Sequence, residues 1–284
     1  MTHEPDRTSR TIIERVAGAD ALVAPILLFV CAYVAALFVL TWLRFPFIQW
    51  TGLISVSVAT IALLLGWERG RWSIGLAAPP ARAVSEFGSG ALFGALLIGV
   101  CATIVALTTP VDHAAGKGFP WLEVVAVFAP AAVHEELLFR GYVFQKLREW
   151  RRWFAIVLIA AVFAALHAGN SAVSNLGLAN IFLGGILLGL AYERHLRLWF
   201  PIGLHLAWNV MTGPILGHEV SGYESMRTLL VERGDGPAWA TGGDFGIEGS
   251  VWMTVVEVAA IVLLLKSAGS SRQVVAFESS GRRV

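Results

Sequence analysis

Residues 131–145 read AAVHEELLFRGYVFQ. His134, Glu135, Glu136 and Arg140 lie in this stretch, and most of its other residues are apolar. An ionisable side chain at the centre of a membrane helix costs about 2.5–3.5 kcal/mol on insertion scales. Four such side chains in one apolar segment therefore need a physical reason: mutual pairing, internal water or a chemical function.

The composition indicates that this segment lies in a membrane. The chain has 284 residues, of which 56% are hydrophobic and 14% are charged. Soluble domains have about 25% charged residues, and about 20 helical residues cross a bilayer. We predict an all-α, polytopic membrane bundle of about eight transmembrane helices, at residues 21–43, 49–67, 86–109, 120–147, 153–167, 178–193, 199–216 and 250–265.

The Lys and Arg residues predict the orientation of this bundle. Sixteen of them lie in the two termini or in the loops on the same side of the predicted spans, against four on the other side: Arg44, Lys117, Arg227 and Arg233. Positive charge is retained on the cytoplasmic side, so we expect both termini there. We expect an integral protein of the bacterial inner (plasma) membrane, with the first apolar run kept as a span rather than removed as a signal peptide.

The same pattern predicts one domain. Residues 1–20 are expected to form a cytoplasmic tail, residues 21–266 a single domain with its core at about 120–214, and residues 267–284 a disordered cytoplasmic tail. The net charge of +1 gives no indication of a nucleic-acid partner. A Gly-rich acidic loop at 217–249 is expected on the outer side, where it is placed to cover the bundle.

Small residues spaced four apart predict close helix contacts. Gly90 and Gly94 form one such pair, and Gly185 and Gly189 form another. In lipid, pairs of this kind allow two helix backbones to approach closely. Helix packing is therefore the interpretation we prefer for both pairs.

Helical spacing separates the two glutamates of residues 131–145. Glu136 and Arg140 are four residues apart, so they share a face and are expected to form an ion pair. Glu135 is rotated by about 100° from Glu136 on a helix of 3.6 residues per turn. Glu135 is therefore the carboxylate that we expect to be free, as a general base requires.

Two later spans supply partners for these carboxylates. One ends in Phe163-Ala-Ala-Leu-His167, and another contains His205-Leu-Ala-Trp-Asn209. Carboxylate, imidazole and amide from three helices form a set that activates a water and stabilises an oxyanion. Glu257 is a further buried carboxylate without an evident partner, for which we expect a water-filled crevice or a structural hydrogen bond.

A zinc site is an alternative interpretation of the same residues. His134 and Glu135 begin like the H-E-x-x-H motif, but the fifth position is Leu138. Zinc ligands from His134, His167 and His205 on three helices remain possible on sequence grounds. Because the helical ligand pair is missing, we expect neither a metal nor another cofactor.

Three motifs together resemble a known family. They are Glu-Glu-x-x-x-Arg, Phe-x-x-x-His and His-x-x-x-Asn (or Asp), and here they read EELLFR at 135–140, FAALH at 163–167 and HLAWN at 205–209. In this order they resemble the CPBP family, the CAAX proteases and bacteriocin-processing enzymes, whose eukaryotic members are type 2 CAAX prenyl endopeptidases. The resemblance covers about residues 120–214.

The resemblance implies a glutamate-dependent intramembrane endopeptidase of eight helices. It implies six site residues: Glu135, Glu136, Arg140, His167, His205 and Asn209. The first glutamate would activate a water with help from His167, and Glu136 with Arg140 would organise the site. His205 and Asn209 would bind the oxyanion.

The implied partner is a membrane-anchored protein or peptide with a CAAX-like or other C-terminal signal. Two other classes stay open: a non-catalytic bacteriocin-immunity or scaffold protein that keeps the motif as a polar core, and a transporter whose Glu135, Glu136 and Glu257 carry protons. The lack of a long internal repeat argues against the transporter.

Overall fold

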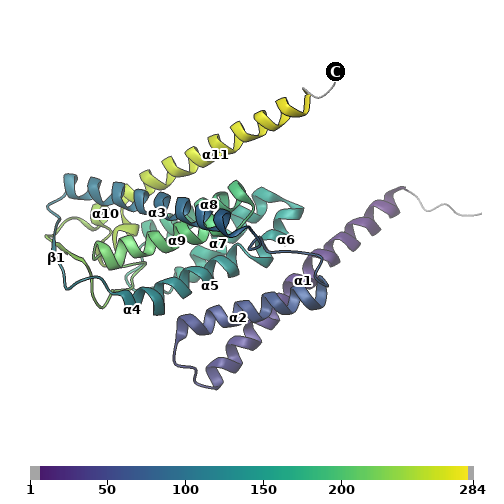
Figure 1. The fold of residues 1–284 in the computed structure, drawn as a ribbon, viewed down its shortest axis with the longest axis horizontal. Helices are drawn as coiled ribbons and strands as arrows, with labels where there is room; N and C mark the ends of the chain where they lie inside the picture. Colours follow the sequence, from purple (N-terminus) through teal and green to yellow (C-terminus); the bar gives the residue numbers. More distant parts are fainter. Residues whose placement is uncertain (1–6, 281–284) are drawn as a thin grey trace, which may run out of the picture.

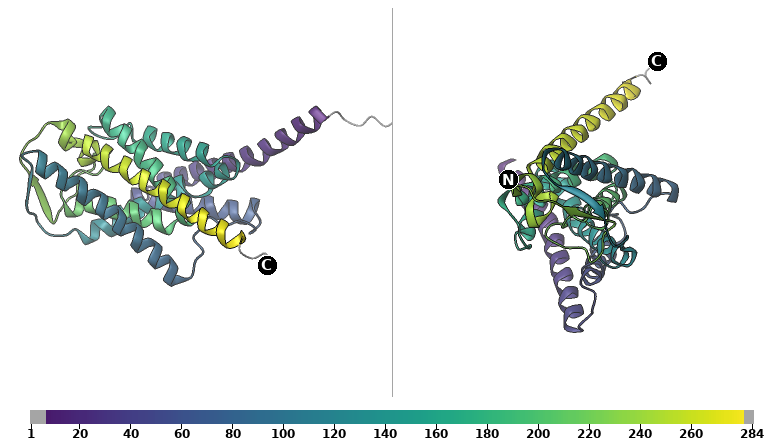
Figure 2. Two further views of the ribbon diagram at one scale, coloured as in Figure 1. Left: turned by 90° about the horizontal axis from the view of Figure 1, so that it is seen from above. Right: turned by 90° about the vertical axis from the view of Figure 1, so that its left-hand side faces the viewer.

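The computed structural model describes the backbone of residues 7–280 and the side chains of residues 22–267. Most of this part of the chain is helical, and the helices pack into an elongated bundle with the α1–α2 hairpin on one side and α11 on the other (Figures 1 and 2). The elements are α1 (Arg7–Trp42), α2 (Ile48–Ala62), η1 (Leu63–Trp67), α3 (Pro80–Thr108), β1 (Asp112–Ala115), α4 (Trp121–Glu123), η2 (Val124–Phe128), α5 (Ala129–Phe139), α6 (Tyr142–Trp150), α7 (Arg152–His167), α8 (Asn175–His195), α9 (Trp199–Val210), η3 (Met211–Ile215), β2 (Leu230–Arg233), α10 (Ala238–Thr241), η4 (Gly243–Phe245), η5 (Ile247–Gly249) and α11 (Val251–Ser280).

Each predicted span falls on a helix or on a run of consecutive helices. Among the described residues, four segments are long and apolar enough to cross a membrane: Leu22–Trp42, Ile48–Trp67, Pro80–Thr108 and Asn175–His195. Arg152–His167 is a shorter apolar helix. The helical class is confirmed, whereas eight crossings remain a prediction.

Apolar side chains cover the outside of the α1–α2 hairpin. Phe38, Trp42 and Ile48 are 71%, 74% and 81% exposed. Soluble proteins rarely expose so much contiguous apolar surface. In a bilayer this surface contacts lipid, and its exposure carries no free-energy penalty. The four apolar segments and these outward-facing side chains indicate an integral membrane protein.

Glycines allow α3 and α9 to pack more extensively than any other pair of described helices. A Cβ atom added to Gly90 would lie 2.1 Å from the carbonyl oxygen of Phe200, and one added to Gly94 would lie 2.3 Å from that of Leu204. On the facing helix, a Cβ at Gly203 would lie 2.1 Å from the carbonyl oxygen of Phe87. The predicted packing role of the Gly90 and Gly94 pair is confirmed.

The second glycine pair joins α8 to α7. A Cβ at Gly185 would lie 2.8 Å from the Cα of Ala160, and one at Gly189 would make ordinary contact with Ile156 at 3.4 Å. The close approach therefore occurs at Gly185. This position also brings α8 within reach of Arg140, as described below.

The prediction of one continuous span at 120–147 is wrong. α5 ends at Phe139, and α6 begins at Tyr142 after a break at Arg140 and Gly141. Gly141 has φ −76° and ψ −129°, and a Cβ there would lie 2.0 Å from the carbonyl oxygen of Leu137. Only glycine fits this turn, which hydropathy does not detect because the flanking residues stay apolar.

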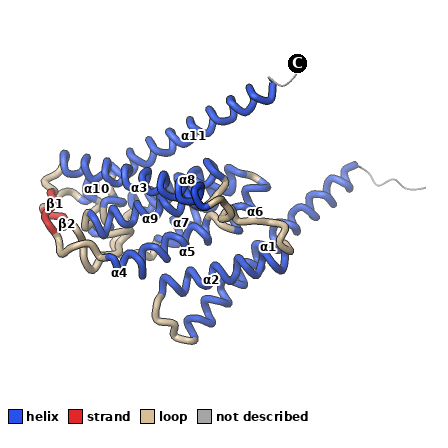
Figure 3. Tube along the Cα trace, viewed as in Figure 1, coloured by secondary structure: helices blue, strands red, loops and turns tan. Residues whose placement is uncertain are grey.

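A small sheet was not expected in an all-α chain. β1 and β2 pair antiparallel, with Asp112 opposite Arg233 and Ala115 opposite Leu230, at one end of the bundle (Figure 3). Each strand has four residues and lies in a loop, so its apolar pattern is too short to predict a strand. The sheet fastens the 217–249 loop to the segment that follows α3.

The predicted tails overlap the terminal helices. α1 begins at Arg7 and α11 continues to Ser280. The remaining residues of the predicted tails, 1–6 and 281–284, lie outside the described backbone.

Candidate active site

The ion pair expected on α5 is present and fully buried. Arg140 Nη1 lies 3.1 Å from Glu136 Oε1, and neither side chain is exposed to solvent. Arg140 Nη2 donates to the carbonyl oxygen of Gly185 at 3.0 Å, and its guanidinium carbon lies 5.0 Å from the centre of the Phe163 ring. The break after α5 places Arg140 at the helix end, where its side chain bridges α5 to α7 and α8. The prediction that Glu136 is the paired carboxylate is confirmed.

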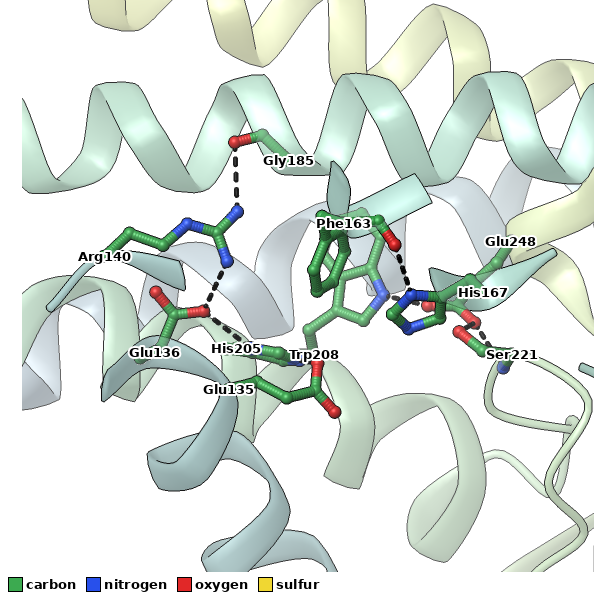
Figure 4. A network of polar contacts seen from close by, with 10 residues as sticks. All are labelled: Glu135, Glu136, Arg140, Phe163, His167, Gly185, His205, Trp208, Ser221 and Glu248. Carbon is green, nitrogen blue, oxygen red and sulfur yellow. Dashed lines mark hydrogen bonds and ion pairs between the residues drawn. The ribbon is translucent and has the colours of Figure 1, made fainter. Parts of the chain in front are cut away.

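His205 of α9 bridges the two glutamates (Figure 4). Its Nδ1 lies 2.8 Å from Glu136 Oε1, which is hydrogen-bonding distance. Its Nε2 lies 3.8 Å from Glu135 Oε2, which is too long for a hydrogen bond. Because Nδ1–H donates to the carboxylate of Glu136, the ring is fixed with Nε2 directed towards Glu135.

Glu135 differs from its neighbour in exposure and in partners. Its side chain is 25% exposed, whereas that of Glu136 is 0% exposed. Among the residues whose side chains are described, none donates a hydrogen bond to Glu135. The helical spacing predicted that Glu135 is the free carboxylate, and the structure agrees with this.

A cavity of about 390 Å³ adjoins this carboxylate. Glu135, Phe163, His205 and Asn209 form part of its wall, and Asn209 lies one turn after His205 on α9. A space of this size holds several residues of an extended peptide or a small ligand. The carboxylate, an imidazole and an amide thus line one cavity.

His167 lies beyond Phe163 on α7. Its Nδ1 lies 2.8 Å from the carbonyl oxygen of Phe163, and the two rings are 4.4 Å apart between centres. The centre of the Phe163 ring is also 6.4 Å from that of His205. His167 itself does not line the cavity. Its Nδ1–H is engaged by the backbone, which leaves Nε2 available.

Sequence reasoning missed a second polar cluster on the cavity wall. Glu248 is 5% exposed and accepts hydrogen bonds from Trp208 Nε1 at 2.6 Å and from Ser221 Oγ at 2.7 Å. These contacts tie the 217–249 loop to α9, and the loop residues Ser221 and Gly222 line the cavity. The acidic character of the loop was the available signal, but no spacing distinguishes Glu248 from its other carboxylates.

His134 faces away from this site. Its Nε2 lies 2.9 Å from the hydroxyl of Tyr33 on α1. Its ring fills the space above Gly52 of α2, where a Cβ would lie 2.6 Å from the imidazole. Among the described residues, no three His, Cys, Asp or Glu side chains are placed to hold a metal ion. The alternative ligand set of His134, His167 and His205 is therefore not assembled.

Comparison with known proteins gives one family match. Residues 117–211 match the family model described as "Type II CAAX prenyl endopeptidase Rce1-like". This segment resembles that family. The matched segment contains all six predicted site residues, and the resemblance inferred from the three motifs is confirmed there.

The chain is also similar to an uncharacterised 24.3 kDa protein of Escherichia coli. The two are 31% identical over 88 residues, which make up 30% of this chain and 40% of that protein. The chain therefore spans less than half the length of this relative.

Proposed function

We propose that this chain is an intramembrane endopeptidase that hydrolyses a peptide bond in a membrane-tethered protein bearing a CAAX-like or other C-terminal signal. One observation carries the proposal. Glu135 lines the cavity and accepts no hydrogen bond from any described residue, while the adjacent Glu136 is held by Arg140 and His205. Two neighbouring carboxylates with such different surroundings are typical of a division between a reacting group and a positioning group.

The reaction begins at Glu135. Its carboxylate accepts a proton from a water in the cavity, and the water oxygen bonds to the carbonyl carbon of the substrate. The family resemblance assigns His167 to orient this water. Nε2 is the nitrogen left for this role, because Nδ1–H already donates to the Phe163 carbonyl, and the ring has to approach the water from outside the cavity wall. The attack produces a tetrahedral intermediate whose former carbonyl oxygen is negatively charged.

His205 and Asn209 are assigned to this oxyanion. Both line the cavity, and Glu136 fixes the His205 ring through Nδ1. With Nε2 protonated, His205 donates to the oxyanion together with the Asn209 amide. The C–N bond then breaks, the leaving nitrogen takes the proton from Glu135, and the products are a new carboxyl terminus and a free amine.

A comparison of cellular membranes tests the proposal. Cells expressing the wild-type chain are expected to contain new protein C-termini that are absent when Glu135→Gln is expressed instead. Glu224→Gln, a change of an exposed carboxylate outside the cavity, is the matched control and should leave these C-termini in place. If the Glu135→Gln chain folds normally and still produces them, the mechanism is wrong.

Chelation separates the glutamic mechanism from its zinc-dependent alternative. The glutamic mechanism predicts that cleavage by the purified chain survives prolonged treatment with a strong zinc chelator. Activity that is lost on chelation and restored by zinc would favour the alternative, with ligands other than the set containing His134.

A further inference from the structure

Glu257 lies in the same cavity but has no part in the proposed chemistry. It projects from α11, is 2% exposed, and lines the cavity together with Glu135 and His205. Its Oε2 atom is buried without a hydrogen-bond partner among the described residues. Among the described carboxyl groups on the cavity wall, it is the one with a fully buried oxygen that lacks a hydrogen-bond partner.

The surrounding helix is shaped to accept the carboxyl group. A Cβ added to Gly184 of α8 would lie 3.1 Å from Glu257 Oε1, closer than ordinary van der Waals contact. Glycine at this position therefore leaves room for the acid against the helix backbone. The group is held in place by packing rather than by a donor.

The neighbouring polar groups already have hydrogen-bond partners. Asn180 donates from Nδ2 to the carbonyl oxygens of Glu248 and Ser250 at 2.7 and 2.8 Å, and its Oδ1 accepts from Thr254 at 2.6 Å. Glu248 is satisfied by Trp208 and by Ser221. No described residue that lines the cavity is a lysine or an arginine.

Leaving a buried acid unpaired is costly, and a donor supplied by an occupant of the cavity removes that cost. Since three carboxylates and no lysine or arginine line the cavity among the described residues, its electrostatic preference is for a cationic group. Ile181, Leu187 and Leu188 provide an apolar wall on the same side. A long aliphatic stem that ends in a positive charge fits both features.

We propose that Glu257 forms a subsite for a lysine or arginine side chain of the substrate. The aliphatic stem packs against α8, and the terminal N–H groups donate to the carboxylate of Glu257. This subsite rests on the proposed function in one respect, that the cavity holds a peptide. It makes Glu257 a residue that determines specificity rather than one that reacts.

Binding without cleavage tests the subsite. The full chain carrying Glu135→Gln is placed in nanodiscs of zwitterionic lipid, and fluorescent apolar decapeptides are titrated onto it. One series has a single lysine moved through the peptide, and the matched series has norleucine at the same place, which keeps the methylenes and removes the charge. At one lysine position or more, we expect binding at least tenfold tighter than that of the norleucine partner.

Variants of the chain assign this preference to Glu257. Adding Glu257→Gln should bring the ratio of lysine to norleucine affinity close to one without weakening the norleucine peptide, whereas adding Glu224→Gln should leave the ratio unchanged. The proposal is overturned if no lysine position exceeds its partner by more than twofold, or if the preference survives Glu257→Gln in a chain with unchanged thermal unfolding.

The outcome is separable from that of the proposed function. A lysine preference in a chain that proves unable to cleave any protein would support the subsite and reject the protease. Cleavage that depends on Glu135 without a lysine preference would support the protease and reject the subsite.

Discussion

At the scale of single residues, two adjacent glutamates on one helix have opposite surroundings. Glu136 is enclosed by Arg140 and His205, whereas Glu135 faces the cavity. The cost of burying Glu136 is offset only while both partners remain, since a buried charge that loses its partner is strongly destabilising. We therefore expect Glu136 to contribute to stability and Glu135 to reactivity.

Arg140→Met is expected to destabilise the chain by about 3–5 kcal/mol, because it leaves the buried carboxylate of Glu136 without its cation. Unfolding by a denaturing detergent, followed by circular dichroism, measures this loss. Glu135→Gln is the control and should change the unfolding free energy by less than about 0.5 kcal/mol. Equal losses in the two variants would show that the pair does not stabilise the fold.

At the scale of helices, glycine sets the distances between elements. Gly90, Gly94 and Gly203 bring the backbones of α3 and α9 together, and Gly141 permits the turn between α5 and α6. In lipid there is no hydrophobic force between helices, so close packing supplies much of their association. α9 carries His205 and Asn209, so this packing also positions the site.

Gly94→Ala is expected to cost about 1–3 kcal/mol, the usual range for overpacking a tight interior. Its Cβ would meet three backbone atoms of Leu204, which cannot move without shifting α9. Gly99→Ala on the same helix is the control, because nothing lies within 4 Å of its Cβ. Thermal unfolding should show no loss for Gly99→Ala, and an equal loss for both would attribute the effect to the helix rather than to the contact.

The contact between the end of η1 and α6 predicts a pH dependence. Burial raises the pKa of Glu68, but hydrogen bonds from Tyr142 and Lys146 outweigh it, so the pKa of Glu68 lies below its ordinary value. The Tyr142 hydroxyl donates to Glu68 Oε1 at 2.6 Å, and Lys146 Nζ lies 2.9 Å from the same atom. Stability from this group is present above the pKa of the unfolded chain and is lost as the pH falls through the lower pKa of the folded chain.

Glu68→Gln is therefore expected to lower the thermal unfolding temperature at neutral pH, with a difference from wild type that shrinks below about pH 4. Melting curves of both chains between pH 3 and 8 test this. Glu149→Gln is the control, since Glu149 is 53% exposed and 3.9 Å from Lys146. A difference for Glu68→Gln that is constant over this range would contradict the assignment.

At the scale of the whole molecule, the two ends of the bundle differ in chemistry. α3 begins beside ion pairs in which Arg82 and Arg197 bind Glu86, and its far end leads into β1. The second strand of that sheet belongs to the 217–249 loop, which also lines the cavity. The end at which α3 begins is the one rich in Lys and Arg. We predict from this charge distribution that it lies in the cytoplasm.

Cysteine labelling tests this orientation. In a chain carrying Cys31→Ser and Cys101→Ser, a membrane-impermeant maleimide added to intact cells should label Glu224→Cys and should not label Glu149→Cys. Both positions are exposed, so accessibility within the protein does not decide the result. Permeabilised cells should give equal labelling, and the opposite pattern on intact cells would invert the topology.

The sequence by itself determined what depends on local periodicity. Apolar runs located the helices, the i,i+4 spacing paired Glu136 with Arg140, and the glycine pairs marked helix contacts. These features depend on the geometry of one helix and on the solvent around it, which composition reveals. The three motifs also located the Rce1-like segment.

Only the tertiary structure decided which distant groups meet. His134 turned away to Tyr33, His205 reached both glutamates, and Glu248 came from a loop to hold Trp208. Such contacts join residues 40 to 101 positions apart. They follow from how the helices cross and where α5 breaks, and no periodic pattern in the sequence encodes those distances.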